Sequence, residues 1–106
     1  MTFDFKDKVV LITGAGSGLG YACAVAFANA GAKVAITDIS QNALDKAIVA
    51  LRDTGAEVLG LLNDASDSGD VNILLDAIIT RFGRLDIAVN NAGTATPLQE
   101  FHEVGE

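Results

Sequence analysis

The chain alternates between short apolar runs and longer segments in which apolar residues recur every three or four positions. Four short runs, in which polar residues do not alternate with apolar ones, predict strands buried on both faces, as in a parallel sheet. These runs are Val9–Thr13, Lys33–Asp38, 57–62 and 87–89.

The three segments between these runs have the periodicity of amphipathic helices. For the first helix we expect the buried face to consist of Leu19, Ala22, Cys23, Ala26, Phe27 and Ala30. For the second we expect Leu44, Ala47, Ile48 and Leu51, and for the third Val71, Leu74, Leu75, Ile78, Ile79 and Phe82.

Residues at the ends of these segments are typical of helix termini. Gly31, Gly55 and Gly83 follow the last apolar turn of each helix, where a glycine commonly ends it. Ser40 and Asp67 precede the second and third helices and are expected to cap them.

Strands and helices thus alternate in the order β-α-β-α-β-α-β with short connections. This order predicts the α/β class, with a doubly wound parallel sheet between helices. Right-handed crossovers with one reversal give the strand order 3-2-1-4. We expect one nucleotide-binding unit over residues 1–93, and a polar loop or the start of a further helix over 94–106.

Four glycines stand between the first strand and the first helix, at positions 14, 16, 18 and 20. Glycines allow a sharp turn and leave no Cβ between the backbone and a ligand. The helix that follows offers unpaired N–H groups and the positive end of its dipole, which suit a phosphate or pyrophosphate. An ordinary turn remains the alternative, because the spacing fits neither a P-loop nor G-x-G-x-x-G, where Leu19 replaces the third glycine.

Polar residues also follow the other predicted strands, at the edge of a parallel sheet where ligands bind. Asp38 ends the second strand about 20 residues past the glycines, where a carboxylate can bind the adenosine ribose. It would repel a 2′-phosphate, so NAD is expected rather than NADP. Asp64 follows the third strand, and Asn90-Asn91-Ala92-Gly93 ends the fourth. A solvated aspartate, a loop aspartate and a simple turn are the respective alternatives.

Taken together, these motifs resemble those of classical short-chain dehydrogenases/reductases in order and spacing. The resemblance rests on Thr13-Gly14-x-x-x-Gly18-x-Gly20, Asp38, Asp64 and Asn90-Asn91-Ala92-Gly93. It implies a Rossmann-type fold and an oxidoreductase that transfers hydride between a nicotinamide coenzyme and an alcohol or carbonyl substrate.

The resemblance also implies a set of coenzyme contacts. Phosphate contacts are expected from Ser17, Gly18, Leu19 and Gly20, in the turn that begins at Gly14. The adenosine ribose is expected on Asp38 with Ile39 beside the adenine, further adenine contacts at Asp64 and Ala65, and contacts near the second ribose from Asn90, Ala92 and Gly93.

The catalytic residues of the family have no counterpart in this chain. Chemistry in the family uses a serine and Tyr-x-x-x-Lys, but Val25 stands four residues after the one tyrosine, Tyr21, and the last lysine is Lys46. No catalytic residue is therefore assigned. We expect the N-terminal part of a longer, truncated enzyme; a non-catalytic dinucleotide-binding module and a remnant that folds only with a partner are the alternatives.

Composition narrows the remaining choices. The formal net charge of −7 disfavours nucleic-acid and anionic-membrane partners, which need a basic face. One cysteine, Cys23, and one histidine, His102, allow neither an internal disulfide nor a zinc site. With no recognisable signal peptide or membrane span, we expect a cytoplasmic protein. A homo-oligomer is left open.

Overall fold

The computed structural model describes residues 4–16, 18–63 and 68–91, within which the predicted alternation of strands and helices is confirmed. The elements are β1 (Val9–Thr13), α1 (Gly18–Asn29), β2 (Lys33–Asp38), α2 (Gln41–Arg52), β3 (Val58–Leu62), α3 (Ser68–Phe82) and β4 (Ile87–Asn90). Each strand agrees with its predicted range to within one residue at either end.

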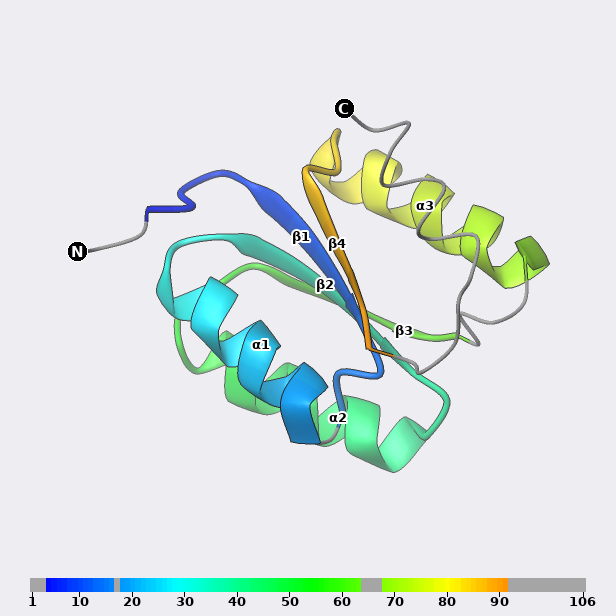
Figure 1. Ribbon diagram of the computed structural model, residues 1–106, viewed down its shortest axis with the longest axis horizontal. Helices are drawn as coiled ribbons and strands as arrows, with labels where there is room; N and C mark the ends of the chain where they lie inside the picture. Colours follow the sequence, from blue (N-terminus) through cyan, green and yellow to red (C-terminus); the bar gives the residue numbers. More distant parts are fainter. Residues whose placement is uncertain (1–3, 17, 64–67, 92–106) are drawn as a thin grey trace.

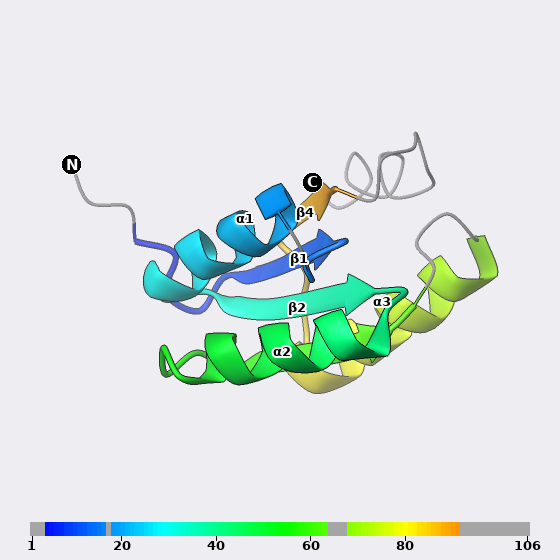
Figure 2. The same ribbon diagram turned by 90° about the horizontal axis from the view of Figure 1, so that it is seen from below.

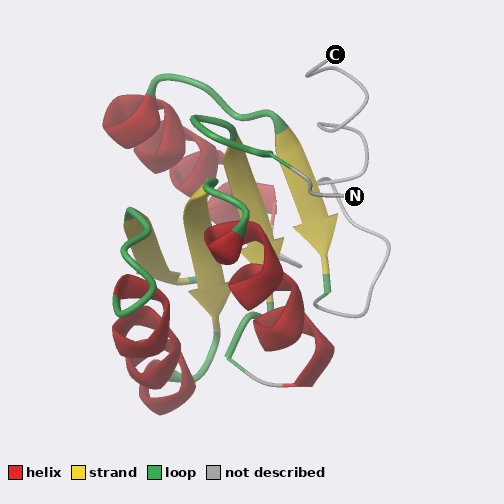
Figure 3. Ribbon diagram, turned by 90° about the vertical axis from the view of Figure 1, so that its left-hand side faces the viewer, coloured by secondary structure: helices red, strands yellow, loops and turns green. Residues whose placement is uncertain are grey.

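The four strands form one parallel sheet in the predicted order β3-β2-β1-β4. Figure 3 shows all four arrowheads at the same end of the sheet. In register, Thr13 of β1 lies opposite Thr37 of β2 and Asn90 of β4. The residues that follow three different strands are therefore brought to one edge, although they are far apart in the sequence.

Helices cover both faces of the sheet and create two separate cores (Figure 1). On one face Val10 and Ile12 pack with residues of α1 and α2, and α2 runs alongside β2 (Figure 2). On the other face Val9 and Leu11 pack with α3. All five residues of β1 are buried, which explains why its first four positions are apolar on both faces of the strand.

The helix boundaries follow the expected local signals. The Ser40 hydroxyl accepts a hydrogen bond from the Ala43 N–H at 3.3 Å, which confirms the predicted N-cap of α2. Gly31, Gly55 and Gly83 follow α1, α2 and α3 with φ of 97°, 91° and 81°, the left-handed conformation that favours glycine. The predicted cap of α3, Asp67, lies outside the described residues.

The predicted faces of α2 and α3 are largely confirmed. Leu44, Ala47 and Leu51 of α2 are buried, and Ile48 packs against them. On α3 the buried residues are Val71, Leu74 and Ile78; Leu75 and Phe82 are partly buried, and Ile79 is exposed.

The predicted buried face of α1 is wrong. Its buried residues are Gly20, Ala24 and Ala28, whereas Leu19, Ala22 and Ala26 are exposed. Cys23 and Ala30 are half-buried; of the predicted set, Phe27 packs against the core. Small or apolar residues occupy nearly every position of α1, so no row of polar residues marks its exposed side. Because the helix packs close to the sheet, its smallest residues are the ones that face the sheet.

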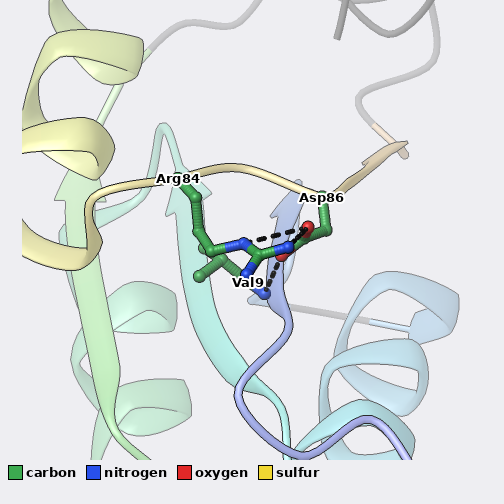
Figure 4. Close-up of polar contacts among 3 residues, drawn as sticks. All are labelled: Val9, Arg84 and Asp86. Atoms are coloured by element: carbon green, nitrogen blue, oxygen red, sulfur yellow. Dashed lines mark hydrogen bonds and ion pairs between the residues drawn. The ribbon is translucent and has the colours of Figure 1, made fainter. Parts of the chain in front are cut away.

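A carboxylate at the opposite end of the sheet joins β4 to β1 (Figure 4). Asp86 Oδ2 accepts from the Val9 N–H at 2.8 Å, and the Asp86 N–H donates to the Val9 carbonyl at 2.9 Å. Arg84 Nε donates to Asp86 Oδ1 at 3.1 Å. Burial raises the pKa of Asp86, but the Val9 N–H and the positive charges of Arg84 and Lys8 outweigh burial, so the pKa lies below its usual value.

We expect Ile78→Ala to lower the free energy of unfolding by about 2–5 kcal/mol, because it leaves a cavity under α3. Ile78 is fully buried, whereas Ile73 on the same helix is 65% exposed. Ile73→Ala is therefore the matched control and should change stability by less than about 1 kcal/mol. Urea unfolding followed by circular dichroism measures both; equal losses would contradict the packing of α3.

Asp86→Asn should lower the free energy of unfolding by about 1–3 kcal/mol at neutral pH, because the Val9 N–H and Arg84 lose the negative charge of their hydrogen-bond acceptor. A folded-state pKa below the unfolded value gives stability that is present above about pH 4 and is lost as pH falls through the folded pKa. The difference in the free energy of unfolding between wild type and Asp86→Asn should therefore become smaller as pH is lowered below about 4. Urea unfolding at a series of pH values tests this, with the exposed Asp76→Asn as control; a constant difference would contradict it.

Candidate functional site

The carboxyl ends of β1, β2 and β4 bring together the predicted site residues that the structure describes. These are Gly14, Gly18, Leu19, Gly20, Asp38, Ile39 and Asn90. The predicted contacts at Ser17, Asp64, Ala65, Ala92 and Gly93 lie outside the described residues, as does His102.

The glycine turn, residues 14–20, uses its glycines in two different ways. Gly14 and Gly18 have φ of 63° and 53°, so they supply a backbone conformation that other residues rarely adopt. Gly20 instead supplies space: a Cβ there would lie 2.3 Å from the Gly14 carbonyl oxygen and 2.5 Å from Asn91 Nδ2. The first turn of α1 thereby approaches the ends of β1 and β4 without an intervening side chain.

Thr13 and Asn91 hold β4 against the glycine turn. The Thr13 hydroxyl oxygen accepts from the Asn91 N–H at 2.9 Å and lies 3.2 Å from Asn90 Oδ1. Asn91 Nδ2 donates to the Gly14 carbonyl at 3.3 Å. The asparagine pair therefore links the end of β4 to the end of β1 and to the glycine turn.

Asp38 fastens the glycine turn to the start of α2. Its Oδ2 accepts from the Gly16 N–H at 3.0 Å, and its Oδ1 accepts from the Ser40 N–H at 2.9 Å. The Ala15 N–H adds a hydrogen bond to the Thr37 carbonyl at 3.0 Å. The carboxylate is half-buried, and each oxygen retains a second lone pair for a further donor.

Asn63 is a buried polar residue that connects β2, β3 and α3. Its N–H donates to the Asp38 carbonyl at 3.1 Å, and its Nδ2 donates to the Asp70 carbonyl at 2.9 Å. Its Oδ1 is buried without a hydrogen-bond partner among the described groups. It thus fixes the first turn of α3 relative to the edge that carries Asp38.

Two large apolar side chains at this edge of the sheet are exposed. Ile39, directly after β2, is 76% exposed, and Leu19, in the first turn of α1, is 71% exposed. The first turn of α1 carries no acidic residue. This edge therefore combines the positive end of a helix dipole, a carboxylate one strand away and apolar surface, the features that a nucleotide needs.

The sequence does not single out three residues that build this edge. Thr13 and Gly16 stand within the glycine motif, with no signal for a separate role. Asn63 carried no signal except its place directly after a predicted strand, next to Asp64.

Other candidate features lie elsewhere or are small. Tyr21 is half-buried and packs against the core, and Cys23 is a half-buried free thiol. A hollow of about 350 Å³ lies between α2 and the start of β3, lined in part by Arg52 and Arg81, and contains none of the predicted site residues. In the described part of the chain, no three potential metal ligands gather, and no helix could cross a membrane.

Comparison with protein families and curated proteins gives a consistent result. The family model "short chain dehydrogenase" matches residues 8–106. Levodione reductase of Leifsonia aquatica is 47% identical over 94 residues, which cover 87% of this chain and 35% of that protein. Of the curated relatives that match first, the chain spans 33% to 40% of the length.

Solved structures share the same arrangement. A short-chain dehydrogenase/reductase of Burkholderia phymatum in complex with NAD is 40% identical with a TM-score of 0.78, over 82% of this chain and 31% of that one. A short-chain dehydrogenase of Mycobacterium paratuberculosis bound to NAD is 29% identical with a TM-score of 0.81, over 89% and 40%.

Thr13→Val should lower the free energy of unfolding by about 1–3 kcal/mol, because the half-buried Asn91 N–H loses its acceptor while the side-chain shape is kept. Thr13→Ser keeps the hydroxyl and is the matched control. Chemical unfolding measures both, and hydrogen exchange of the Asn91 amide should accelerate in the valine variant alone. If serine costs as much as valine, packing rather than this hydrogen bond joins β4 to β1.

Proposed function

The chain belongs to the short-chain dehydrogenase/reductase family, and from that premise we propose that it is the coenzyme-binding part of an NAD-dependent oxidoreductase. The observation that carries the proposal is the glycine turn, which brings the N-terminus of α1 against the strand ends with no Cβ between them. Backbone N–H groups in the first turn of a helix have no partner within the helix and suit a pyrophosphate.

Asp38 supports the choice of NAD over NADP. Its carboxylate is fixed by two backbone N–H groups and has lone pairs left for the hydroxyls of the adenosine ribose. A 2′-phosphate at the same place would meet like charge, which disfavours NADP. Relatives from two genera are bound to NAD in their structures.

The remaining contacts are proposed from the same arrangement. The exposed Ile39 would cover one face of the adenine, and Asp64 with Ala65 would contact its edge. Ser17, Gly18, Leu19 and Gly20 would contact the phosphates. Asn90, Ala92 and Gly93 would lie near the second ribose.

The bound coenzyme would carry the hydride of the whole protein's reaction: NAD⁺ would accept it from an alcohol, and NADH would donate it to a carbonyl compound. This chain contributes binding and orientation, because it has no Tyr-x-x-x-Lys to move the proton. A non-catalytic dinucleotide-binding module is the second candidate, and the same missing residues favour it. A reducing, cytoplasmic location is proposed from the one cysteine, Cys23.

Titration of the purified chain with NADH, followed by coenzyme fluorescence, tests the proposal, and competition compares NAD⁺ with NADP⁺. The wild type should prefer NAD⁺, and Asp38→Ala should lower that preference about tenfold, the effect of one lost charged hydrogen bond. Asp45→Ala, on α2 away from the glycine turn, is the control and should leave it unchanged.

Three results are decisive here. Wild type that does not bind NADH would contradict the proposal as a whole. Binding with an unchanged preference in Asp38→Ala would contradict the role of Asp38. Binding without turnover of any alcohol or ketone would favour the non-catalytic module.

A further inference from the structure

We propose that Gly16 is a positioning residue for coenzyme selection: it fixes the carboxylate of Asp38 in the orientation that distinguishes NAD from NADP. This inference rests on the proposed function and assigns a role to a glycine that the family's spacing motif leaves unspecified. It depends on a contact between the glycine turn and the end of β2.

Two backbone N–H groups, one for each oxygen, hold the Asp38 carboxylate in its orientation. The Gly16 N–H donates to Oδ2 at 3.0 Å, and the Ser40 N–H donates to Oδ1 at 2.9 Å. Ser40 also caps α2 by accepting from the Ala43 N–H. The carboxylate therefore has one donor from the glycine turn and one from the start of α2, and rotation of the side chain would break both hydrogen bonds.

The space at Gly16 leaves no room for a side chain. An added Cβ would lie 2.5 Å from the Ala43 Cβ and 2.7 Å from Asp38 Oδ2. Ala43 Cβ can move only with the backbone of α2, which its cap holds in place. The Asp38 side chain can yield by rotating away from the glycine turn, which relieves the second contact, whereas the contact with Ala43 Cβ is relieved only by a shift of the turn or of α2.

Gly16 differs in this respect from its neighbours Gly14 and Gly18. Those two have positive φ, whereas Gly16 does not, so an alanine at position 16 needs no left-handed backbone conformation. What excludes a side chain at Gly16 is the carboxylate and α2. Gly16→Ala combined with Ala43→Gly removes the contact with α2, so this double variant tests the carboxylate's position most directly.

Displacement of the Asp38 carboxylate should change the relative affinity of the chain for NAD⁺ and NADP⁺. A displaced carboxylate loses its hydrogen bonds to the ribose hydroxyls of NAD, and it no longer repels a 2′-phosphate. Gly16→Ala should therefore weaken NAD⁺ binding about tenfold and change NADP⁺ binding by less than about threefold, or strengthen it.

The experiment measures dissociation constants of the 106-residue chain for NAD⁺ and NADP⁺ by competition with NADH fluorescence. Gly60→Ala is the matched control, because a Cβ there would meet Ile48 Cδ1 at 2.3 Å, in the middle of β3, which lies two strands away from β1 and the glycine turn. We expect the coenzyme ratio, defined as the dissociation constant for NADP⁺ divided by that for NAD⁺, to fall about tenfold in Gly16→Ala. In Gly60→Ala this ratio should stay at the wild-type value.

A double variant shows whether Gly16 acts through Asp38. In an Asp38→Ala background, Gly16→Ala should leave the ratio unchanged, because the group that it positions is gone. If Gly16→Ala weakens both coenzymes equally, or lowers the ratio just as far without Asp38, the inference is overturned. Wild type that binds neither coenzyme would instead overturn the proposed function, on which the inference rests.

A second variant covers the case in which Gly16→Ala does not fold, as judged by circular dichroism. Gly16→Ala combined with Ala43→Gly removes the 2.5 Å contact and keeps the contact with Asp38. The same fall in ratio is expected in this folded protein, and an unchanged ratio overturns the inference.

Discussion

The carboxylate of Asp38 is the constraint on which the candidate site depends. It accepts two backbone N–H groups, from Gly16 and Ser40, and the Asp38 carbonyl accepts a third from Asn63. One residue thus joins the glycine turn, the start of α2 and the end of β3. In a half-buried position such charge-assisted hydrogen bonds are stronger than neutral ones, so the residue proposed to bind the ribose is also one that shapes the turn beside it.

Side-chain hydrogen bonds join β1 and β4 at both ends of this strand pair. β4 lies next to β1, which comes more than 70 residues earlier in the chain. At the amino end Asp86 bonds Val9, and at the carboxyl end Thr13 bonds Asn91. The Asp86–Val9 contact stabilises the strand pair at the end of the sheet that is remote from the proposed site. The Thr13–Asn91 contact places Asn90 and Asn91 at the edge where a coenzyme would bind.

Most of the fold could be predicted from the sequence because its signals are local. The first four residues of β1 are apolar, since both its faces are covered, and α2 and α3 carry mostly polar outer faces that mark their orientation. α1 has no such contrast, and its predicted face was therefore wrong. Gly20 is buried against the strand ends, and Ala24 and Ala28 are buried in the core beside β1 and β2, because small residues let the helix approach the sheet closely.

The sequence by itself determined the alternation of elements, the strand order, the glycine turn and the acidic residue after β2, because side-chain size, polarity and backbone preference act within a few residues. Only the tertiary structure decided which glycine meets which side chain. The contact of Gly16 with Asp38 spans 22 residues and that of Thr13 with Asn91 spans 78. Such contacts exist only once the parallel strands bring their carboxyl ends together, and no local pattern encodes them.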